Sequence, residues 1–219
     1  MEIGEFDLDL RWSYAVGAAV VVVSLVVSAV SYPSLPSEMV VHWDASGTPD
    51  GGMSKPLAVL LLPALSAVVL VVLAALPRID PLGENIEEFR KEYDGLVVVM
   101  SGFLGYVHLL VVLLNTGYDF EIIRALSPAV AALYYYVGVV IESAERNWFV
   151  GIRTPWTLSD ERVWRETHDR AGTLLKLSSV VALGGLVFPD RATLFLVAPV
   201  ALVAAYATLF SYLMYRRGG

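Results

Sequence analysis

The 219-residue sequence contains no cysteine and few charged residues. The absence of cysteine excludes disulfide bonds and thiol chemistry. Only 17% of the residues are charged and 57% are hydrophobic, whereas soluble domains average about 25% charged and about 45–50% apolar residues. The net charge of −7 argues against a nucleic-acid partner, because phosphate backbones attract basic proteins. How the few charges are distributed decides between a membrane protein and an unusually apolar soluble domain.

Charged residues are missing from six long stretches of the chain. Five stretches contain no Asp, Glu, Lys or Arg and a sixth contains only Lys176; they are residues 12–37, 56–77, 95–118, 125–141, 171–189 and 192–215. A helix needs about 20 apolar residues to cross the hydrocarbon core of a bilayer. We therefore predict an all-α membrane bundle of six transmembrane helices. It should form a single domain over residues 1–219, with the first two helices in 12–77 and the last four in 95–219.

Basic residues concentrate on one side of the six predicted helices. Six crossings place both termini on the same side, whose loops hold 11 basic residues against three in the opposite loops. The 11 are Arg11, Arg78, Arg90, Lys91, Arg146, Arg153, Arg162, Arg165, Arg170, Arg216 and Arg217, and the three are Lys55, Arg124 and Arg191. Because Lys and Arg favour cytoplasmic loops, we expect both termini in the cytoplasm of a cell-membrane protein.

The predicted external loop at residues 32–55 is dense in turn-forming residues. Its candidate binding residues are His42, Trp43, Asp44, Gly47, Asp50 and Lys55. Gly and Asp favour tight turns, so a rigid loop without further function is one interpretation. A second is a divalent metal site at His42, Asp44 and Asp50, since imidazole and carboxylates suit zinc-like ions. A third is a docking surface for an arriving peptide, with Trp43 at its tip.

A second unusual string lies in the predicted cytoplasmic loop at residues 142–170. Its candidate residues are Asn147, Gly151, Arg153, Thr154, Pro155, Trp156, Trp164 and His168. Pro155 disfavours helix at the preceding residue, and Thr157 with Asp160 resembles a helix-capping pair. The residues after this pair predict an amphipathic helix on the inner surface that runs into the fifth transmembrane helix.

Two of these internal residues allow more than one role. Arg153 could anchor the loop at the membrane surface, or bind a carboxylate or phosphate with two parallel hydrogen bonds. For His168 we favour a packing role beside Trp164, because the sequence shows no nucleophile for a catalytic histidine to activate.

Three polar residues interrupt the third predicted transmembrane helix. Ser101, His108 and Asn115 are spaced seven apart, so they share one face that must point toward the bundle interior. Ionisable groups inside a membrane are functional candidates. The alternative for His108 is a hydrogen bond that joins two helices.

Two motifs resemble known families. His42-Trp43-x-x-x-Gly47-x-x-Asp50, followed by Ser54-Lys55, is similar to a domain of unknown function in which Phe and Asn are common at positions 43 and 44. Asn147 through Trp156, with Trp164, Thr167-His168 and Gly172, resembles the SdpI family. The resemblance implies a bacterial-type integral membrane protein. It also implies immunity to a secreted antimicrobial peptide toxin and retention of a transcriptional repressor at the membrane.

Our leading hypothesis is therefore an immunity or signalling receptor in the lipid bilayer. A peptide toxin or another extracellular ligand would bind the external loop, and the internal segment would report this to a cytoplasmic repressor. The alternatives are a metal-dependent membrane enzyme and a transporter with His108 as a proton relay. We predict no catalytic residue and no cofactor apart from the candidate metal, because no nucleophile–base pair is visible.

Overall fold

The computed structural model describes residues 3–218, with side chains from residue 12 onward. Within these residues, six helices are long and apolar enough to cross a membrane, which confirms the predicted all-α membrane bundle. They are α1 (Ile3–Ser31), α2 (Lys55–Ile79), α4 (Arg90–Asn115), α5 (Ile122–Ser143), α7 (Glu161–Ala182) and α9 (Ala192–Gly218). The side chain of Arg11, one of the basic residues counted above, lies outside the described residues.

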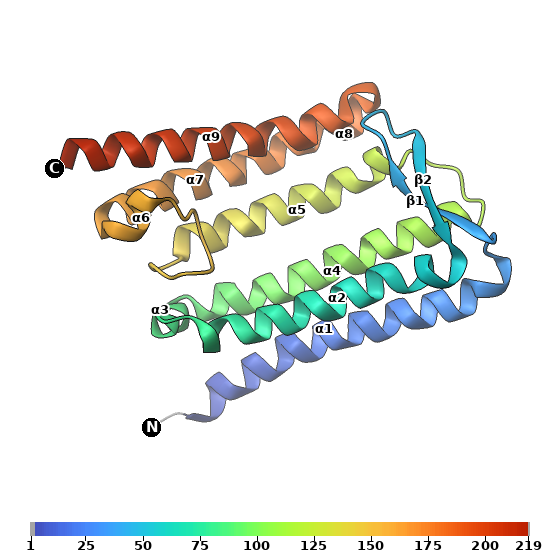
Figure 1. Ribbon diagram of the computed structural model, residues 1–219, viewed down its shortest axis with the longest axis horizontal. Helices are drawn as coiled ribbons and strands as arrows, with labels where there is room; N and C mark the ends of the chain where they lie inside the picture. The colour runs from blue at the N-terminus through green and yellow to red at the C-terminus, as the bar shows by residue number, and fades with distance from the viewer. Residues whose placement is uncertain (1–2, 219) are drawn as a thin grey trace.

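The long helices lie side by side in two groups (Figure 1). Helices α1, α2 and α4 pack against one another, as do α5, α7 and α9, and the contact between α4 and α5 joins the groups. Both chain termini lie at one end of the bundle, which we call the terminus end. A two-stranded sheet lies at the opposite end, which we call the hairpin end.

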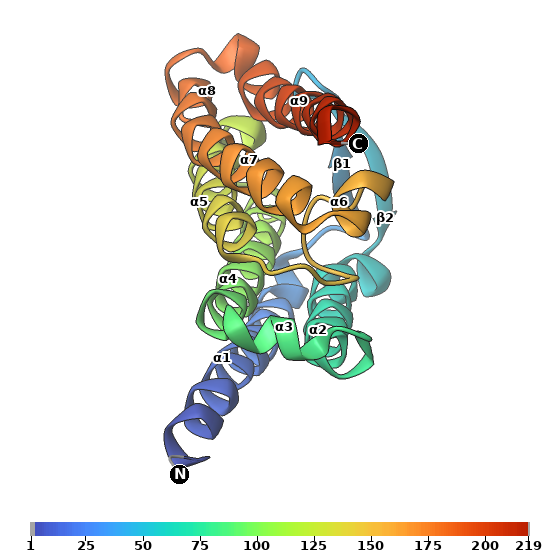
Figure 2. The same cartoon turned by 90° about the vertical axis from the view of Figure 1, so that its left-hand side faces the viewer.

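Short elements close the two ends. The terminus end carries α3 (Gly83–Glu88) and α6 (Pro155–Ser159), and the hairpin end carries α8 (Gly184–Val187) (Figures 1 and 2). Two 3-10 turns, η1 (Tyr32–Ser34) and η2 (Pro189–Arg191), adjoin the hairpin end. Each carries a proline in its first turn, where the fixed backbone angle of proline suits a helix start.

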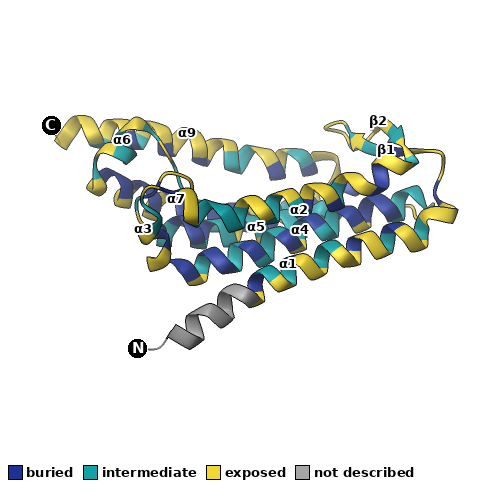
Figure 3. Cartoon of the chain, turned by 60° about the horizontal axis from the view of Figure 1, so that its bottom comes forward, coloured by how far each residue is buried: buried dark blue, intermediate teal, exposed yellow. Residues whose placement is uncertain are grey.

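The outward faces of the long helices are apolar, as a bilayer requires. Large side chains such as Val30, Val71 and Leu202 are exposed, and most of α9 is open on its outer side (Figure 3). Exposed aromatic side chains lie near both ends of the bundle, with Tyr118 at the hairpin end and Trp12 at the terminus end. Such aromatic belts mark the boundaries between membrane and water.

Two glycines allow α5 and α7 to touch backbone to backbone. A Cβ atom on Gly172 would lie 2.6 Å from the carbonyl oxygen of Gly138, so neither position tolerates a side chain without movement. Beside this crossing, Lys176 Nζ lies 2.5 Å from Glu142 Oε2, and the Thr173 hydroxyl donates to the other carboxylate oxygen. The single charge in the fifth apolar stretch, on Lys176, is therefore paired across this close helix contact.

Of two predictions for residues 154–182, the position of the helix cap was wrong and the amphipathic helix was confirmed. The helix cap is Thr154 rather than Thr157, because Pro155 occupies the first position of α6 and Thr157 the third, where it completes a capping box. Asp160 instead caps α7, where its carboxylate accepts from the amide of Val163. The predicted amphipathic segment runs into the fifth transmembrane helix: its turns are the first turns of α7, which directly follows the short helix α6.

Candidate functional site

The predicted external loop is a β-hairpin, which sequence reasoning missed. Strands β1 (Glu38–Trp43) and β2 (Pro49–Ser54) pair antiparallel, with Met39 opposite Met53. β2 gave little signal because Pro, Asp and two Gly residues make up most of it, and these residues are depleted in strands. At the tip, Gly47 has a φ of +83°, which favours glycine.

The carboxylate of Asp44 organises the hairpin tip. Its Oδ1 accepts hydrogen bonds from the hydroxyl and amide of Ser46 and from the amide of Thr48, at 2.6, 2.8 and 2.9 Å. These bonds stabilise the charged form and lower the pKa of Asp44 below its ordinary value, with the Ser46 hydroxyl contributing most. The Asp44 carboxylate therefore stabilises its own turn.

The structure does not assemble the metal site that the spacing allowed. His42 Nδ1 lies 2.5 Å from Asp50 Oδ1, but Asp44 is turned into the tip. Across the residues with described side chains, no three His, Asp or Glu residues come together as metal ligands. His42 and Asp50 remain as an exposed pair on the outer surface of the hairpin.

The hairpin is fastened to both helix groups. At its base, the Asn115 amide on α4 donates to the carbonyl of Val40 and accepts from the amide of the same residue, at 2.9 and 2.8 Å. At its tip, the Thr193 hydroxyl on α9 donates to the carbonyl of Ala45 at 2.6 Å. Lys55 donates to the carbonyl of Tyr32 where the hairpin enters α2. The hairpin therefore spans the bundle from α4 to α9 (Figure 1).

An apolar pocket of about 270 Å³ lies beneath the hairpin. It is lined by the hairpin and by α2, α4 and α5, among them Trp43, Leu61, Val111, Ile122 and Leu126. Leu61 is 42% exposed, so the pocket opens toward the bilayer between helices. We call this cavity, with His42 at its edge, the hairpin pocket.

The hairpin end as a whole is acidic. The connections at this end carry six carboxylates against three basic side chains, which are Glu38, Asp44, Asp50, Asp119, Glu121 and Asp190 against Lys55, Arg124 and Arg191. The mouth of the hairpin pocket therefore lies on a surface that attracts cations.

His108 joins three helices in the bundle interior. It is 2% exposed, and its Nε2 lies 3.0 Å from Ser28 Oγ and 3.1 Å from the carbonyl oxygen of Ser24, both on α1. The Ser28 hydroxyl donates its one hydrogen to the carbonyl of Val59 on α2. Ser28 must therefore accept from His108, so Nε2 carries a proton. The other ring nitrogen has no partner among the described residues.

The other two members of the polar stripe also face inward. Ser101 is buried beside Gly17 of α1, where a Cβ atom would lie 2.9 Å from its hydroxyl oxygen. Asn115 reaches the hairpin as described above. The stripe therefore contacts α1 along its length and ends at β1.

Trp164 and His168 form the centre of the internal segment. Their rings stack with centroids 3.9 Å apart and planes 18° apart. His168 Nδ1 donates to the carbonyl of Trp164 at 2.7 Å, and Nε2 accepts from the amide of Ile152 at 2.9 Å. A ring with one donor and one acceptor is neutral. Gly151, with a φ of +128°, passes so close that a Cβ atom would lie 2.5 Å from His168 Nε2.

Asn147 shapes the preceding turn. Its side chain is fully buried: Oδ1 accepts from the amides of Phe149 and Val150, and Nδ2 donates to the carbonyls of Glu145 and Val150. The amide of Trp148 donates to Asp80 at the end of α2. Because both polar atoms of the Asn147 side chain are used within the loop, we assign it a structural role.

The rest of the internal motif docks on α9. The Thr154 hydroxyl donates to Ser211 Oγ at 3.2 Å, and the ring of Trp156 lies 5.0 Å from that of Tyr212. Pro155 begins α6, as above. Arg153 is exposed and makes no hydrogen bond or ion pair within the described residues. Arg153 is the motif residue that is open to a partner.

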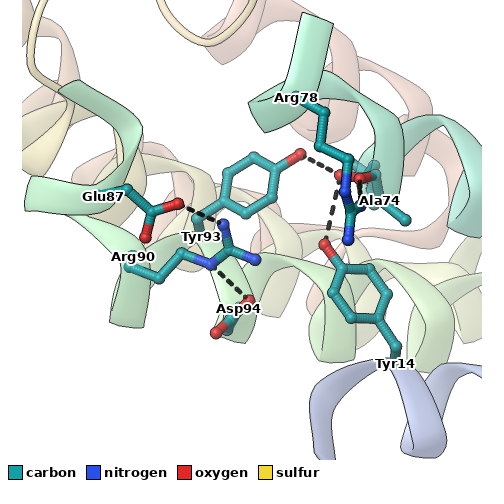
Figure 4. Close-up of polar contacts among 8 residues, drawn as sticks. Tyr14, Ala74, Arg78, Glu87, Arg90, Tyr93 and Asp94 are labelled. Carbon is teal, nitrogen blue, oxygen red and sulfur yellow. Dashed lines mark hydrogen bonds and ion pairs between the residues drawn. The ribbon is translucent and has the colours of Figure 1, made fainter. Parts of the chain in front are cut away.

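Sequence reasoning missed a buried ionic cluster at the terminus end (Figure 4). Arg90 is 8% exposed and contacts Glu87 at 3.1 Å and Asp94 at 3.2 Å. The hydroxyl groups of Tyr93 and Tyr14 both donate to the carbonyl of Leu73 beside it. The spacing of Arg90 and Asp94 by four residues could have indicated the pair, but not its burial.

Two family models match separate parts of the chain. A domain of unknown function (DUF1648) matches residues 19–67, and the SdpI/YfhL protein family matches residues 143–211. A curated protein, Immunity protein SdpI of Bacillus subtilis (strain 168), is 25% identical over 202 residues, which cover 90% of this chain and 93% of that protein. The chain is thus similar to the SdpI/YfhL family over residues 143–211 and to Immunity protein SdpI over most of its length. No solved structure matches the chain.

The SdpI/YfhL match covers the internal loop, α6, α7 and most of α9, and the match to the domain of unknown function covers the hairpin. Each matched segment thus contains one of the two surfaces described above. In this chain, α7 and α8 connect the internal segment with the hairpin end of the bundle.

Proposed function

We propose that this multi-pass membrane protein is an immunity protein, which protects its own membrane from a secreted antimicrobial peptide toxin. The observation that carries the proposal is the relation to Immunity protein SdpI, because it extends over 90% of this chain and 93% of that protein. A match of this extent includes far more than either short motif. The resemblance to the SdpI family supplies the peptide toxin as the class of ligand.

In this proposal both termini lie in the cytoplasm and the hairpin lies outside. The excess of Lys and Arg in the loops of the terminus end supports this orientation. A secreted toxin would then meet the hairpin end first.

The hairpin pocket is the place where the toxin would be intercepted. Its apolar lining and its opening at Leu61 suit a side chain of a peptide that has entered the outer half of the bilayer. Trp43 supplies an aromatic wall, and the exposed pair of His42 and Asp50 lies above it. Such a pocket, with apolar contacts and a polar rim, is the usual anatomy of a recognition site.

The internal segment is, in the same proposal, the docking place of a cytoplasmic transcriptional repressor. Trp148 and Phe149 are 48% and 37% exposed, and Arg153 is exposed in the same loop. Aromatic and Arg side chains are enriched in protein interfaces. The Asn147 turn holds these side chains on a fixed backbone, so little ordering is needed when a partner binds.

The test is survival in co-culture. Cells that lack the protein should be depolarised and killed when grown with unmodified siblings that secrete the toxin, and expression of the full chain should restore survival. Leu61→Trp, which fills the hairpin pocket, should abolish rescue. Leu65→Trp one turn away on α2 should not, because Leu65 is similarly exposed, at 45%, but does not line the pocket.

Two results would contradict the proposal. Equal survival of deleted and complemented cells would refute the immunity function. Full rescue by Leu61→Trp, at normal membrane levels, would refute the hairpin pocket as its site.

A separate variant tests the internal segment. Arg153→Ala should keep the cells alive but release the repressor from the membrane fraction. Unchanged retention of the repressor would show that Arg153 does not belong to the docking surface.

A further inference from the structure

A groove of about 810 Å³ runs along the seam between α7 and α9 at the terminus end. It is distinct from the hairpin pocket and from the internal loop. Its volume is within the range of about 300–1,000 Å³ that is common for small-molecule sites. The α9 side is formed by Leu202, Val203 and Tyr206.

The α7 side of the groove changes from charged to apolar along one helix face. Glu166, Asp169, Arg170, Thr173 and Leu174 line it, and their spacing of 3, 4, 7 and 8 residues from Glu166 places them in one stripe. Because α7 starts at the terminus end (Figure 1), the charged turns lie nearer the water and the apolar turns nearer the bilayer centre. This order of polarity is that of a membrane lipid.

Both signs of charge are available at the head of the groove. Glu166 and Asp169 are exposed and form no ion pair within the described residues. The guanidinium of Arg170 lies over the ring of Phe210, 4.7 Å from its centroid. Stacking of this kind uses the face of the guanidinium and leaves N–H donors on its edge free.

We propose that this groove binds one zwitterionic phospholipid with a primary ammonium head group. Arg170 would donate to the phosphate, since guanidinium matches phosphate oxygens with paired hydrogen bonds. Glu166 and Asp169 would accept from the ammonium, which has three N–H donors. A choline head group has no such donors, and a glycerol head group leaves the lipid anionic beside two carboxylates. One acyl chain would lie against Leu174 and Leu202.

Native mass spectrometry of the full chain in detergent tests the proposal. The probes are three lipids with identical palmitoyl-oleoyl chains and ethanolamine, choline or glycerol head groups. The ethanolamine lipid should bind about two- to fivefold more tightly than either of the others, which is the effect of one exposed charge pair. Arg170→Gln should weaken its binding, and Glu166→Gln with Asp169→Asn should remove the preference over choline.

Matched variants distinguish lipid binding in the groove from lipid binding elsewhere on the surface of α7 and α9. Leu202→Trp fills the groove at a side chain that is 70% exposed and should weaken binding of all three lipids, whereas Leu194→Trp, at a side chain that is 61% exposed on the same helix, should not. Arg165→Gln, outside the groove on α7, is the control for Arg170. Equal binding of the three lipids by the unmodified protein, or unchanged ethanolamine-lipid binding in Leu202→Trp, would overturn the proposal. The survival assay above is independent of this result.

Discussion

The side-chain amide of Asn115 pairs with the backbone of Val40 in the way that a neighbouring strand would. The Asn115 carbonyl accepts from the Val40 amide and the Asn115 amide donates to the Val40 carbonyl. A residue at the end of a transmembrane helix thus replaces the missing strand partner at the edge of β1. This pair fixes the hairpin, and with it the roof of the hairpin pocket, on α4.

Loss of this pair should free the hairpin. Asn115→Leu leaves both polar groups of Val40 without a partner, which costs about 1–3 kcal/mol. Hydrogen exchange of the Val40 amide, followed by mass spectrometry, should become faster. Thr116→Val is the control, because the Thr116 hydroxyl donates only to carbonyls of α4. Equal exchange rates of the Val40 amide in the Asn115 variant and the unmodified protein would show that the hairpin is stable without the Asn115 pair.

Gly151 should tolerate no side chain. Gly151→Ala combines a positive φ with a Cβ atom 2.5 Å from His168 Nε2, and we expect a loss of about 1–3 kcal/mol of stability. Gly102→Ala on α4 is the matched change, since nothing lies within 4 Å of its Cβ position; there we expect a gain of up to about 1 kcal/mol from helix propensity. Thermal unfolding in detergent measures both. Similar melting temperatures for the two variants would refute the close contact.

The buried ionic cluster predicts a contrast between two arginines. Arg90→Leu leaves the nearly buried Asp94 without its partner, and we expect a loss of about 3–5 kcal/mol. Combining it with Asp94→Leu should restore part of the stability. Arg124→Leu removes an exposed contact of 3.8 Å with Glu121 and should cost less than about 1 kcal/mol. If the double variant is less stable than Arg90→Leu, the cluster does not behave as a paired unit.

The hairpin tip should weaken in acid. The pKa of Asp44 is lower in the folded protein than its ordinary value of 3.8, so its carboxylate supports the turn above that value. This contribution is lost as the pH falls through the lowered folded pKa. NMR titration of the full chain should show Asp44 titrating below pH 3.8, together with shifts of the Ser46 and Thr48 amides. Asp44→Asn should remove these coupled shifts, and titration at the ordinary value would contradict the hydrogen bonds.

The sequence was sufficient for the bundle but not for the hairpin. Long stretches without charge have one stable arrangement in a bilayer, so six helices followed from them directly. The hairpin is instead supported through β1 and its tip by Asn115 and Thr193, which are distant in sequence and add their hydrogen bonds only after the helices have packed. Strand propensity cannot anticipate such support.

The candidate residues, too, could be predicted from the sequence only in part. The seven-residue spacing placed Ser101, His108 and Asn115 on one face, but only the structure shows that they contact α1 and the hairpin. The cap at Thr154 was misplaced by three residues because two threonines compete as caps around Pro155. Arg90 was predicted in a loop at the membrane surface rather than in the bundle interior. Whether a charge is buried depends on neighbours that the local sequence does not contain.

The account depends most directly on the hairpin facing the side from which a secreted toxin arrives. Because the chain has no cysteine, single variants such as Ala45→Cys at the hairpin tip and Arg153→Cys in the internal loop can be labelled without background. A maleimide that cannot cross membranes should label the Ala45→Cys variant in intact cells and the Arg153→Cys variant only after permeabilisation. Labelling of Arg153→Cys but not Ala45→Cys in intact cells would place the hairpin inside and contradict the proposed function.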